Sequence, residues 1–321
     1  MRVLAVFLAA AVLCAAPTAA QTTGSATGER QRLLDLAAAE LAAGRRGEAA
    51  RLYAQAADRF QSVRALLQLA RLQAGGGDRS AAIQTLRRAS TLAPSSEDVL
   101  SGFAQLSLAA GAVTPAAVAL QSLTRMCPTV AQYHYLLGVS LMLAGDMVAA
   151  YESLGQADRL EPDKAQTLIA LGLALNSRKM FTEARPYLLR GLDLEPDNID
   201  AVAALAETEE GLGNLDQAEA LASRVLARSG DHANGNLVMG LVLMERGRYA
   251  EAREAFARTA AAQPNLPKAF YQLSLAYARL GDEANAQKYQ ELFRESQRRM
   301  EERLNEIRTE TGMSGSGGMH R

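Results

Sequence analysis

The segments "RLEPD" (Arg159–Asp163) and "DLEPD" (Asp193–Asp197) are nearly identical, and their prolines lie 34 residues apart. From residue 94 to residue 264, steps of 34 reach residues that stop or turn a helix: Pro94, Pro128, Pro162, Pro196, Gly230 and Pro264. Proline has no amide hydrogen and disfavours helix in the residue before it, so each of these prolines can end a helix. The chain therefore contains an internal repeat with a period of 34 residues.

Three further columns of residues keep this period. Glycine recurs at Gly77, Gly111, Gly145, Gly213, Gly247 and Gly281, with Lys179 as the exception. A second column is small throughout: Ala70, Ala104, Gly138, Gly172, Ala206, Gly240 and Ser274. A third is always alanine: Ala82, Ala116, Ala150, Ala184, Ala218, Ala252 and Ala286. Glycine accepts the left-handed backbone that closes a helix, and small side chains allow two helices to cross closely. Each period thus predicts a helix, a turn and a second helix.

Larger apolar residues follow helical spacing around these columns. In the period 131–164, one face of the first helix carries Leu137, Gly138 and Leu141. The opposing face of the second helix carries Ala150, Leu154 and Ala157. A single pair of amphipathic helices cannot cover its own apolar faces, but stacked pairs bury a continuous core. The sequence therefore predicts an all-α stack of helix pairs.

The pattern resembles the tetratricopeptide repeat family, whose 34-residue unit is a helix–turn–helix. That family favours leucine and glycine in the first helix, a large residue three places later, and then alanine, an aromatic residue, alanine and proline. One period matches through Leu171, Gly172, Leu175, Ala184, Leu188 and Pro196, and another through Met239, Gly240, Leu243, Ala252, Phe256 and Pro264. The family's tryptophan column instead holds Leu66, Leu100, His134, Leu168, Val202, Asn236 and Phe270.

The resemblance implies a right-handed α-solenoid of eight units within residues 30–300. The predicted units are 30–62, 63–96, 97–130, 131–164, 165–198, 199–232, 233–266 and 267–300. From Glu283 the helical pattern continues without glycine or proline to about Glu310, so residues 301–310 extend the last helix. We expect this helix to cap the final apolar face, with a coiled-coil contact between two copies as the alternative. Residues 311–321 read as a flexible tail.

The first 20 residues have the features of a secretory signal peptide. A single Arg2 precedes an apolar run from Val3 to Ala16, and small residues follow before a polar stretch. Cleavage is expected after Ala20, with Ala16 and Ala19 as alternatives, and residues 21–29 then form a linker. Leu13 stands where a lipoprotein signal needs a small residue, so lipidation of Cys14 is disfavoured. We expect an exported protein, periplasmic or secreted, without stable membrane insertion after cleavage.

No catalytic, cofactor or metal motif is present. The three histidines, His134, His232 and His320, are far apart in the repeat register. The formal net charge of −1 provides no basic field for nucleic acid. Cys127 is the only cysteine after the leader, which excludes an internal disulfide in the mature chain. We therefore predict a non-catalytic scaffold without cofactor or metal, which binds a protein or peptide; a structural homo-oligomer or homodimer is the alternative.

In the family that the pattern resembles, the first helix of each unit lines the inner surface. The residues expected there are largely apolar, and we call them the inner stripe: Tyr135, Val139, Met142, Ile169, Leu173, Asn176, Glu207, Glu210, Leu237, Leu241, Met244, Tyr271 and Leu275. The family's clamp for a C-terminal carboxylate has counterparts only in Arg71 and Asn176, so that ligand is not expected. An apolar extended or helical segment fits better, with a basic residue near Glu207 or Glu210. The alternative is that the groove is closed by its own side chains.

The unit 199–232 departs most from the pattern of the other units. Glu209 stands where Leu141, Leu175 and Leu243 stand elsewhere, and Gly230 replaces proline. Two interpretations remain open from the sequence: a locally weak unit, or an acidic spot for a basic partner residue.

Overall fold

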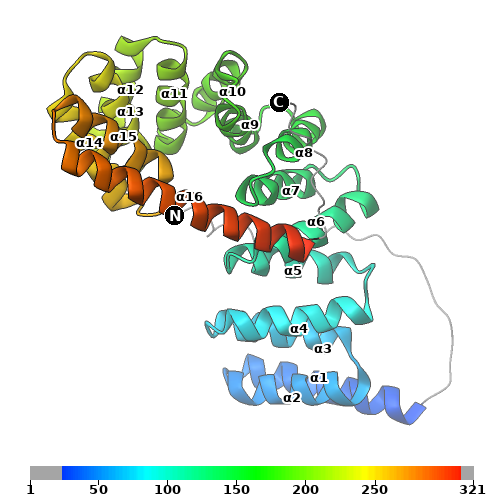
Figure 1. Ribbon diagram of the computed structural model, residues 1–321. Coiled ribbons are helices and arrows are strands. Elements are labelled where there is room, and N and C mark those ends of the chain that lie inside the picture. The colour runs from blue at the N-terminus through cyan, green and yellow to red at the C-terminus, as the bar shows by residue number, and fades with distance from the viewer. Residues whose placement is uncertain (1–23, 312–321) are drawn as a thin grey trace. The chain divides into compact units, whose positions relative to one another are not determined.

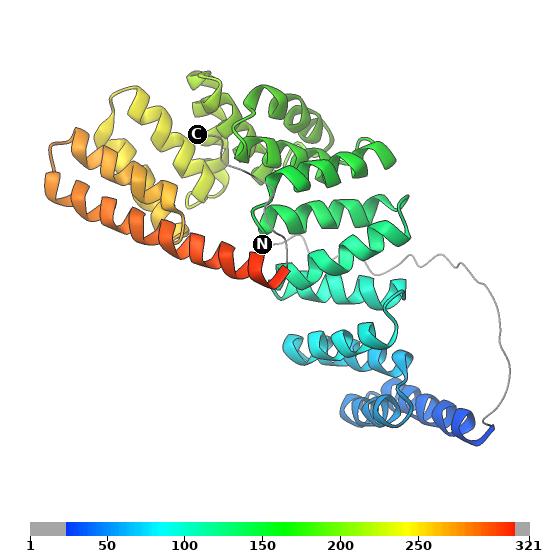
Figure 2. The ribbon, with the colours of Figure 1, turned by 45° about the vertical axis from the view of Figure 1, so that its right-hand side comes forward.

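The computed structural model describes residues 24–311, with side chains from residue 26 to residue 302, and this part of the chain is built of helices without strands. The helices are α1 (Gly24–Ala42), α2 (Arg46–Phe60), α3 (Val63–Gly75), α4 (Arg79–Leu92), α5 (Glu97–Ala109), α6 (Val113–Met126), α7 (Ala131–Leu143), α8 (Met147–Leu160), α9 (Ala165–Ser177), α10 (Phe181–Leu194), α11 (Ile199–Gly211), α12 (Leu215–Arg228), α13 (Ala233–Glu245), α14 (Tyr249–Ala262), α15 (Pro267–Arg279) and α16 (Glu283–Thr311). Consecutive helices pack in pairs, α1 with α2 through α15 with α16 (Figures 1 and 2). The fold is an all-α helical repeat solenoid.

The chain divides into two compact units at Cys127 and Pro128. Unit 1 contains α1–α6, and unit 2 contains α7–α16. The predicted signal peptide and residues 312–321 of the predicted tail lie outside the described residues. The predicted linker 21–29 needs correction, because residues 24–29 already form the first turns of α1. Glu29 in these turns forms an ion pair with Arg59 of α2, which ties the start of α1 to its partner helix.

The turn between paired helices requires a left-handed residue. Gly145 and Gly213 adopt φ of 84° and 82° at this position. Lys179, the one exception in the glycine column, adopts the same conformation with φ of 59°. A side chain with a Cβ is strained there, so the geometry of this turn is set by the repeat and not by the local residue.

The small-residue column lies where the two helices of a pair cross. A Cβ added to Gly172 of α9 would lie 2.5 Å from Leu188 Cγ of α10, and one added to Gly240 of α13 would overlap the ring of Phe256 of α14. The alanine column is fully buried from Ala82 to Ala252. These positions therefore hold glycine or alanine because the partner helix occupies the space.

Unit 2 ends in the long helix α16, which packs on α15 (orange and red in Figure 1). Its first turns supply Tyr289, whose ring stacks on Tyr277 at a centroid distance of 5.4 Å. Tyr271 of α15 meets Phe293 of α16 at 5.3 Å. The first half of α16 is thus the second helix of the last pair, and the same helix continues without interruption to Thr311.

Candidate interaction surface

The first helices of successive pairs in unit 2 contact one another, α7 with α9, α9 with α11, α11 with α13, and α13 with α15. They therefore form one continuous row, and all thirteen residues of the inner stripe lie on it. The environment of the stripe changes from helix to helix.

Three residues of the inner stripe are buried, so they are not open to a partner. Ile169 packs against α10, where a Cβ added to Gly191 would lie 2.7 Å from Ile169 Cγ1. This close approach explains why glycine replaces the second alanine of the repeat in that pair. Leu237 belongs to the apolar core shared with Phe256 and Leu273. The prediction that these positions line a groove is therefore corrected: they belong to the core.

Asn176 is the third buried residue, and both polar atoms of its amide form hydrogen bonds. Its Nδ2 donates to the Ala204 carbonyl at 2.8 Å, and its Oδ1 accepts from the Thr208 hydroxyl at 2.9 Å. Both partners belong to α11, so this side chain joins α9 to the next first helix. Asn176 therefore stabilises the row, and its buried side chain is not open to a ligand.

Apart from the buried Ile169, the apolar residues of α7 and α9 in the inner stripe are half-buried. Tyr135 and Met142 pack against the core of Leu154 and Leu171, and Leu173 packs against the core around Leu188. Burial raises the pKa of the Tyr135 phenol, and the charge of Glu195 raises it further. This end of the stripe offers apolar side-chain edges, together with Val139, which is also half-buried.

The other end of the stripe is more exposed. Tyr271 and Leu275 of α15 have 43% and 36% of their surface exposed, which is high for large apolar side chains. Leu241 and Met244 of α13 are half-buried against the same core as Tyr277. Methionine and tyrosine suit adaptable contacts with a partner.

Between these two apolar regions lies an acidic one, on α11. Glu207 accepts from Asn234 Nδ2 of α13 at 3.4 Å and forms an ion pair with Lys268 Nζ of α15 at 3.3 Å. The side chains of α11 and α15 thus meet across α13, so the inner row is partly closed by its own residues here. Glu210 forms no ion pair or hydrogen bond with the described residues. Burial raises the pKa of its carboxyl; Lys268 opposes this rise, while Glu207 and Glu245 add to it.

Glu209 does not belong to this acidic region, because its carboxylate is buried between α11, α10 and the turn that follows α11. It is 2% exposed, accepts from Arg185 Nε of α10 at 2.7 Å, and accepts from Asn214 Nδ2 at 2.7 Å. Both carboxylate oxygens therefore have charged or polar partners. An ion pair therefore joins α11 to α10 of the preceding pair, at a position where Leu141, Leu175 and Leu243 stand in three other pairs, so Glu209 is no spot for a partner's basic residue.

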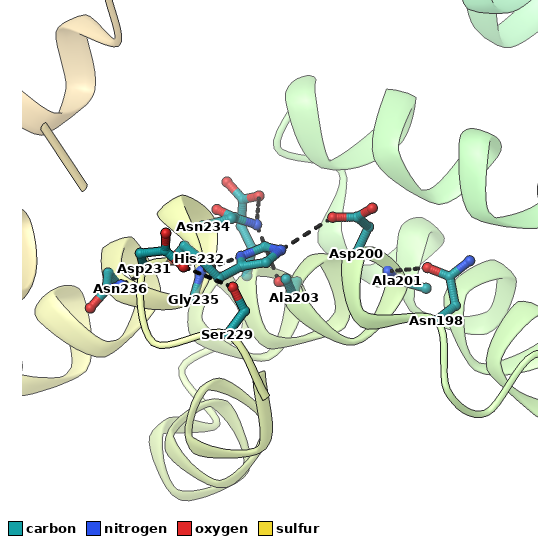
Figure 3. A network of polar contacts seen from close by, with 11 residues as sticks. Asn198, Asp200, Ala201, Ala203, Ser229, Asp231, His232, Asn234, Gly235 and Asn236 are labelled. Carbon is teal, nitrogen blue, oxygen red and sulfur yellow. Dashed lines mark hydrogen bonds and ion pairs between the residues drawn. The ribbon is translucent and has the colours of Figure 1, made fainter. Parts of the chain in front are cut away.

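Polar residues join α11 to the start of α13 (Figure 3). His232 precedes α13, and its Nδ1 accepts from the Gly235 amide at 3.2 Å. Its Nε2 faces Asp200 Oδ1 at 3.2 Å, and Asn234 donates to the Ala203 carbonyl at 3.2 Å. No sequence pattern selects Asn234, Lys268 or His232, because their partners lie about 30 to 60 residues away.

Among residues 24–311, no group of three or more histidine, cysteine, aspartate or glutamate side chains is placed to hold a metal ion. In the same part of the chain, no helix is both long and apolar enough to span a membrane.

Comparisons with known proteins agree with this architecture. Sequence models described as tetratricopeptide repeat match residues 34–97, 175–242 and 237–298, together more than half of the chain. A solved tetratricopeptide repeat protein from Parabacteroides merdae has a TM-score of 0.57 and 15% identity, covering 78% of this chain and 99% of that one. A chain of the APC/C hetero-tetramer Cut9-Hcn1 has a TM-score of 0.56 and 19% identity, covering 78% of this chain and 46% of that one. No curated protein matches the sequence significantly. At these identities the solved structures establish the fold alone.

Proposed function

The chain belongs to the tetratricopeptide repeat family, and from that premise we propose that the inner stripe of unit 2 binds an apolar segment of another protein that carries a basic residue. Proteins of this family are generally non-catalytic interaction scaffolds, and we assign no bond-making step to this one. The observation that carries the proposal is the combination on one row of exposed apolar residues with a half-buried carboxylate. Tyr271 and Leu275 provide the first, and Glu210 provides the second.

The charges on the row favour a basic residue in the partner. Lys268 and Asn234 already engage Glu207, whereas Glu210 has no such partner among the described residues. Burial disfavours the charged form of Glu210, so an incoming cation would relieve an unfavourable state. A lysine or arginine set between apolar residues of the partner matches this arrangement.

Selection from a random peptide library displayed on phage tests this proposal even though the partner is unidentified. The full chain should enrich peptides in which apolar residues flank a lysine or arginine. Leu241→Glu should abolish enrichment, and Glu210→Gln should remove the preference for the basic residue. Leu189→Glu is the matched control, because Leu189 is an exposed leucine on α10, a second helix outside the inner row. Absence of enrichment, or equal loss in the control, would refute the proposal.

We also propose that the protein acts after export, in the periplasm or outside the cell. The support is the leader in residues 1–20, with its apolar run and small residues before a polar stretch. Sequencing the N-terminus of protein recovered from fractionated cells should give a start directly after Ala16, Ala19 or Ala20. A protein that retains Met1 in the cytoplasmic fraction would contradict export.

Self-association is a second candidate function, favoured by one observation. Met300 of α16 is 47% exposed on a helix that continues beyond the last repeat. Light scattering on the full chain and on Met300→Glu distinguishes the two functions. A dimer that the substitution converts to monomer supports self-association, and a monomer at all concentrations excludes it.

A further inference from the structure

A pocket of about 260 Å³ lies in unit 1, between three helices at the blue end of Figure 1. Its volume is just below the range of about 300 to 1,000 Å³ that is common for drug-sized ligands, so it suits a smaller molecule. Neither counterpart of the family's carboxylate clamp, Arg71 or Asn176, belongs to it. The lining residues come from all three helices: Leu34, Asp35 and Ala38 of α1, Tyr53 of α2, and Arg64 and Gln68 of α3.

Tyr53 carries a hydroxyl that has no partner and is open to solvent. The residue is 4% exposed, and its hydroxyl forms no hydrogen bond with the described residues. Within that part of the chain, unpartnered side-chain oxygens that are closed to solvent occur only in Ser107, Asp158 and Asn236, so the Tyr53 hydroxyl is accessible. A largely buried phenol usually finds a hydrogen-bond partner. Because Tyr53 lines the pocket, a ligand there would provide that partner.

The packing of the helices does not require this hydroxyl. Tyr53 stands in a column of the repeat that is otherwise apolar from the second pair to the seventh. Its equivalents are all buried and have no polar side-chain atom: Leu86, Leu120, Leu154, Leu188, Ala222 and Phe256. The position therefore serves the core elsewhere, and in the first pair it also adds a polar group at the pocket.

Two opposite charges line the pocket without pairing with each other. Arg64 forms no ion pair or hydrogen bond with the described residues. Asp35 Oδ1 accepts from Gln31 Nε2 at 2.8 Å, and its Oδ2 has no partner among the same residues. Both charged side chains are exposed, whereas Leu34 and Tyr53 are buried, so the charges stand at the rim of the pocket and the apolar surface at its floor. A ligand with one anionic and one cationic group would pair with both charges.

We propose that this pocket binds a free α-amino acid with a small apolar side chain. The α-carboxylate pairs with Arg64 and accepts a hydrogen bond from the Tyr53 hydroxyl, and the α-ammonium group donates to Asp35 Oδ2. The side chain of the amino acid contacts Leu34 and Ala38. This site lies in unit 1, whereas the inner stripe lies in unit 2, so its test does not depend on the proposed function.

Methyl NMR on the full chain tests the proposal with L-valine as the probe. We expect L-valine to shift the methyl signals of Leu34 and Ala38 with millimolar affinity. Isovalerate is L-valine without the ammonium group, and isobutylamine is L-valine without the carboxylate. Each should bind about fivefold more weakly than L-valine, because an exposed ion pair contributes about that factor.

Three variants separate the contributions of the polar groups. Tyr53→Phe removes only the hydroxyl and should weaken L-valine binding about tenfold, because it removes a hydrogen bond to a charged group. The free energy of unfolding should not change, since this hydroxyl has no partner among the described residues. Asp35→Asn should remove the preference for L-valine over isovalerate, and Arg64→Gln should remove the preference over isobutylamine.

Arg71→Gln is the matched control, because Arg71 is an exposed arginine on the same helix as Arg64 but outside the pocket. This variant should bind L-valine as the wild type does. The proposal is overturned if L-valine causes no shifts, if either analogue binds as tightly as L-valine, or if Tyr53→Phe binds L-valine undiminished. Equal losses in Arg71→Gln and Arg64→Gln would also overturn it, because they would show attraction to the surface charge and not to the pocket.

Discussion

The neighbouring helix pairs 165–198 and 199–232 share one backbone plan but differ in chemistry. Leu173, Leu175 and Asn176 of the first pair correspond to Glu207, Glu209 and Glu210 of the second. Both pairs nevertheless form helices of the same length, α9 with α11 and α10 with α12. The turn and crossing columns therefore specify the fold, whereas the remaining first-helix positions can change from apolar to acidic without altering it.

The largest expected effect concerns Glu209, which replaces a buried leucine. Arg185→Ala would leave this buried carboxylate without its cation and should destabilise unit 2 by about 2–3 kcal/mol. Glu209→Leu introduces the residue that three other pairs have at this position and should change stability by less than about 1 kcal/mol. Chemical denaturation followed by circular dichroism measures both.

Arg190→Ala provides the matched control for this comparison. Arg190 forms an exposed ion pair with Asp163, and such pairs contribute less than about 1 kcal/mol. Equal losses for Arg185→Ala and Arg190→Ala would show that the burial of Glu209 is unimportant.

A smaller effect is expected at the helix crossing. Gly172→Ala places a Cβ 2.5 Å from Leu188 Cγ and should cost about 1–2 kcal/mol, although alanine is the better helix former. The equivalent residue in the next pair is the buried Ala206, and Ala206→Gly should cost about 1 kcal/mol through helix propensity alone. Thermal unfolding compares the two variants. A stabilising Gly172→Ala would mean that the crossing is looser than the structure indicates.

The turn residues should show a still smaller effect of opposite sign. Lys179→Gly relieves a left-handed non-glycine residue and should stabilise the protein by about 0.5–1 kcal/mol. Gly213→Lys introduces the same strain in the next pair and should destabilise it by a similar amount. If both substitutions destabilise, the side chain of Lys179 makes a stabilising contribution that outweighs its backbone strain.

These comparisons show which features could be predicted from the sequence. Gly172, Ala184 and Pro196 belong to columns that recur at a fixed period because each occupies an equivalent place in the helix pair, so the sequence alone predicts helices, turns and crossings. The groove positions predicted for Asn176 and Ile169 are wrong because the repeat column does not say which helix covers a residue. Glu207 forms an ion pair with Lys268, which lies two helix pairs further along the chain. The buried amide of Asn236 donates to the Gly230 carbonyl in the preceding loop. Such contacts follow from three-dimensional packing and leave no periodic signal.

The smallest expected effect is the pH dependence caused by Glu210. Burial raises the pKa of its carboxyl above the ordinary value of 4.5. The folded state therefore holds this proton more tightly than the unfolded state, and the wild-type chain loses stability as the pH rises through the window just above 4.5. Glu210→Gln lacks this loss, so its stability relative to wild type should increase from acidic to neutral pH. Urea unfolding at several pH values checks this, and a constant or shrinking difference would contradict it.

The central claim is that the recurring turn and crossing residues specify the fold, whereas the inner-stripe residues of the first helices determine which peptides bind. The most direct measurement transfers the inner residues of pair 165–198 into pair 199–232 through the double variant Glu207→Leu, Glu210→Asn. Peptide selection and thermal unfolding are then performed on the same protein. We predict unchanged helical content, an unfolding temperature within a few degrees of wild type, and continued enrichment of apolar peptides without the basic residue. An unfolded variant, or an undiminished preference for lysine or arginine, would contradict the account.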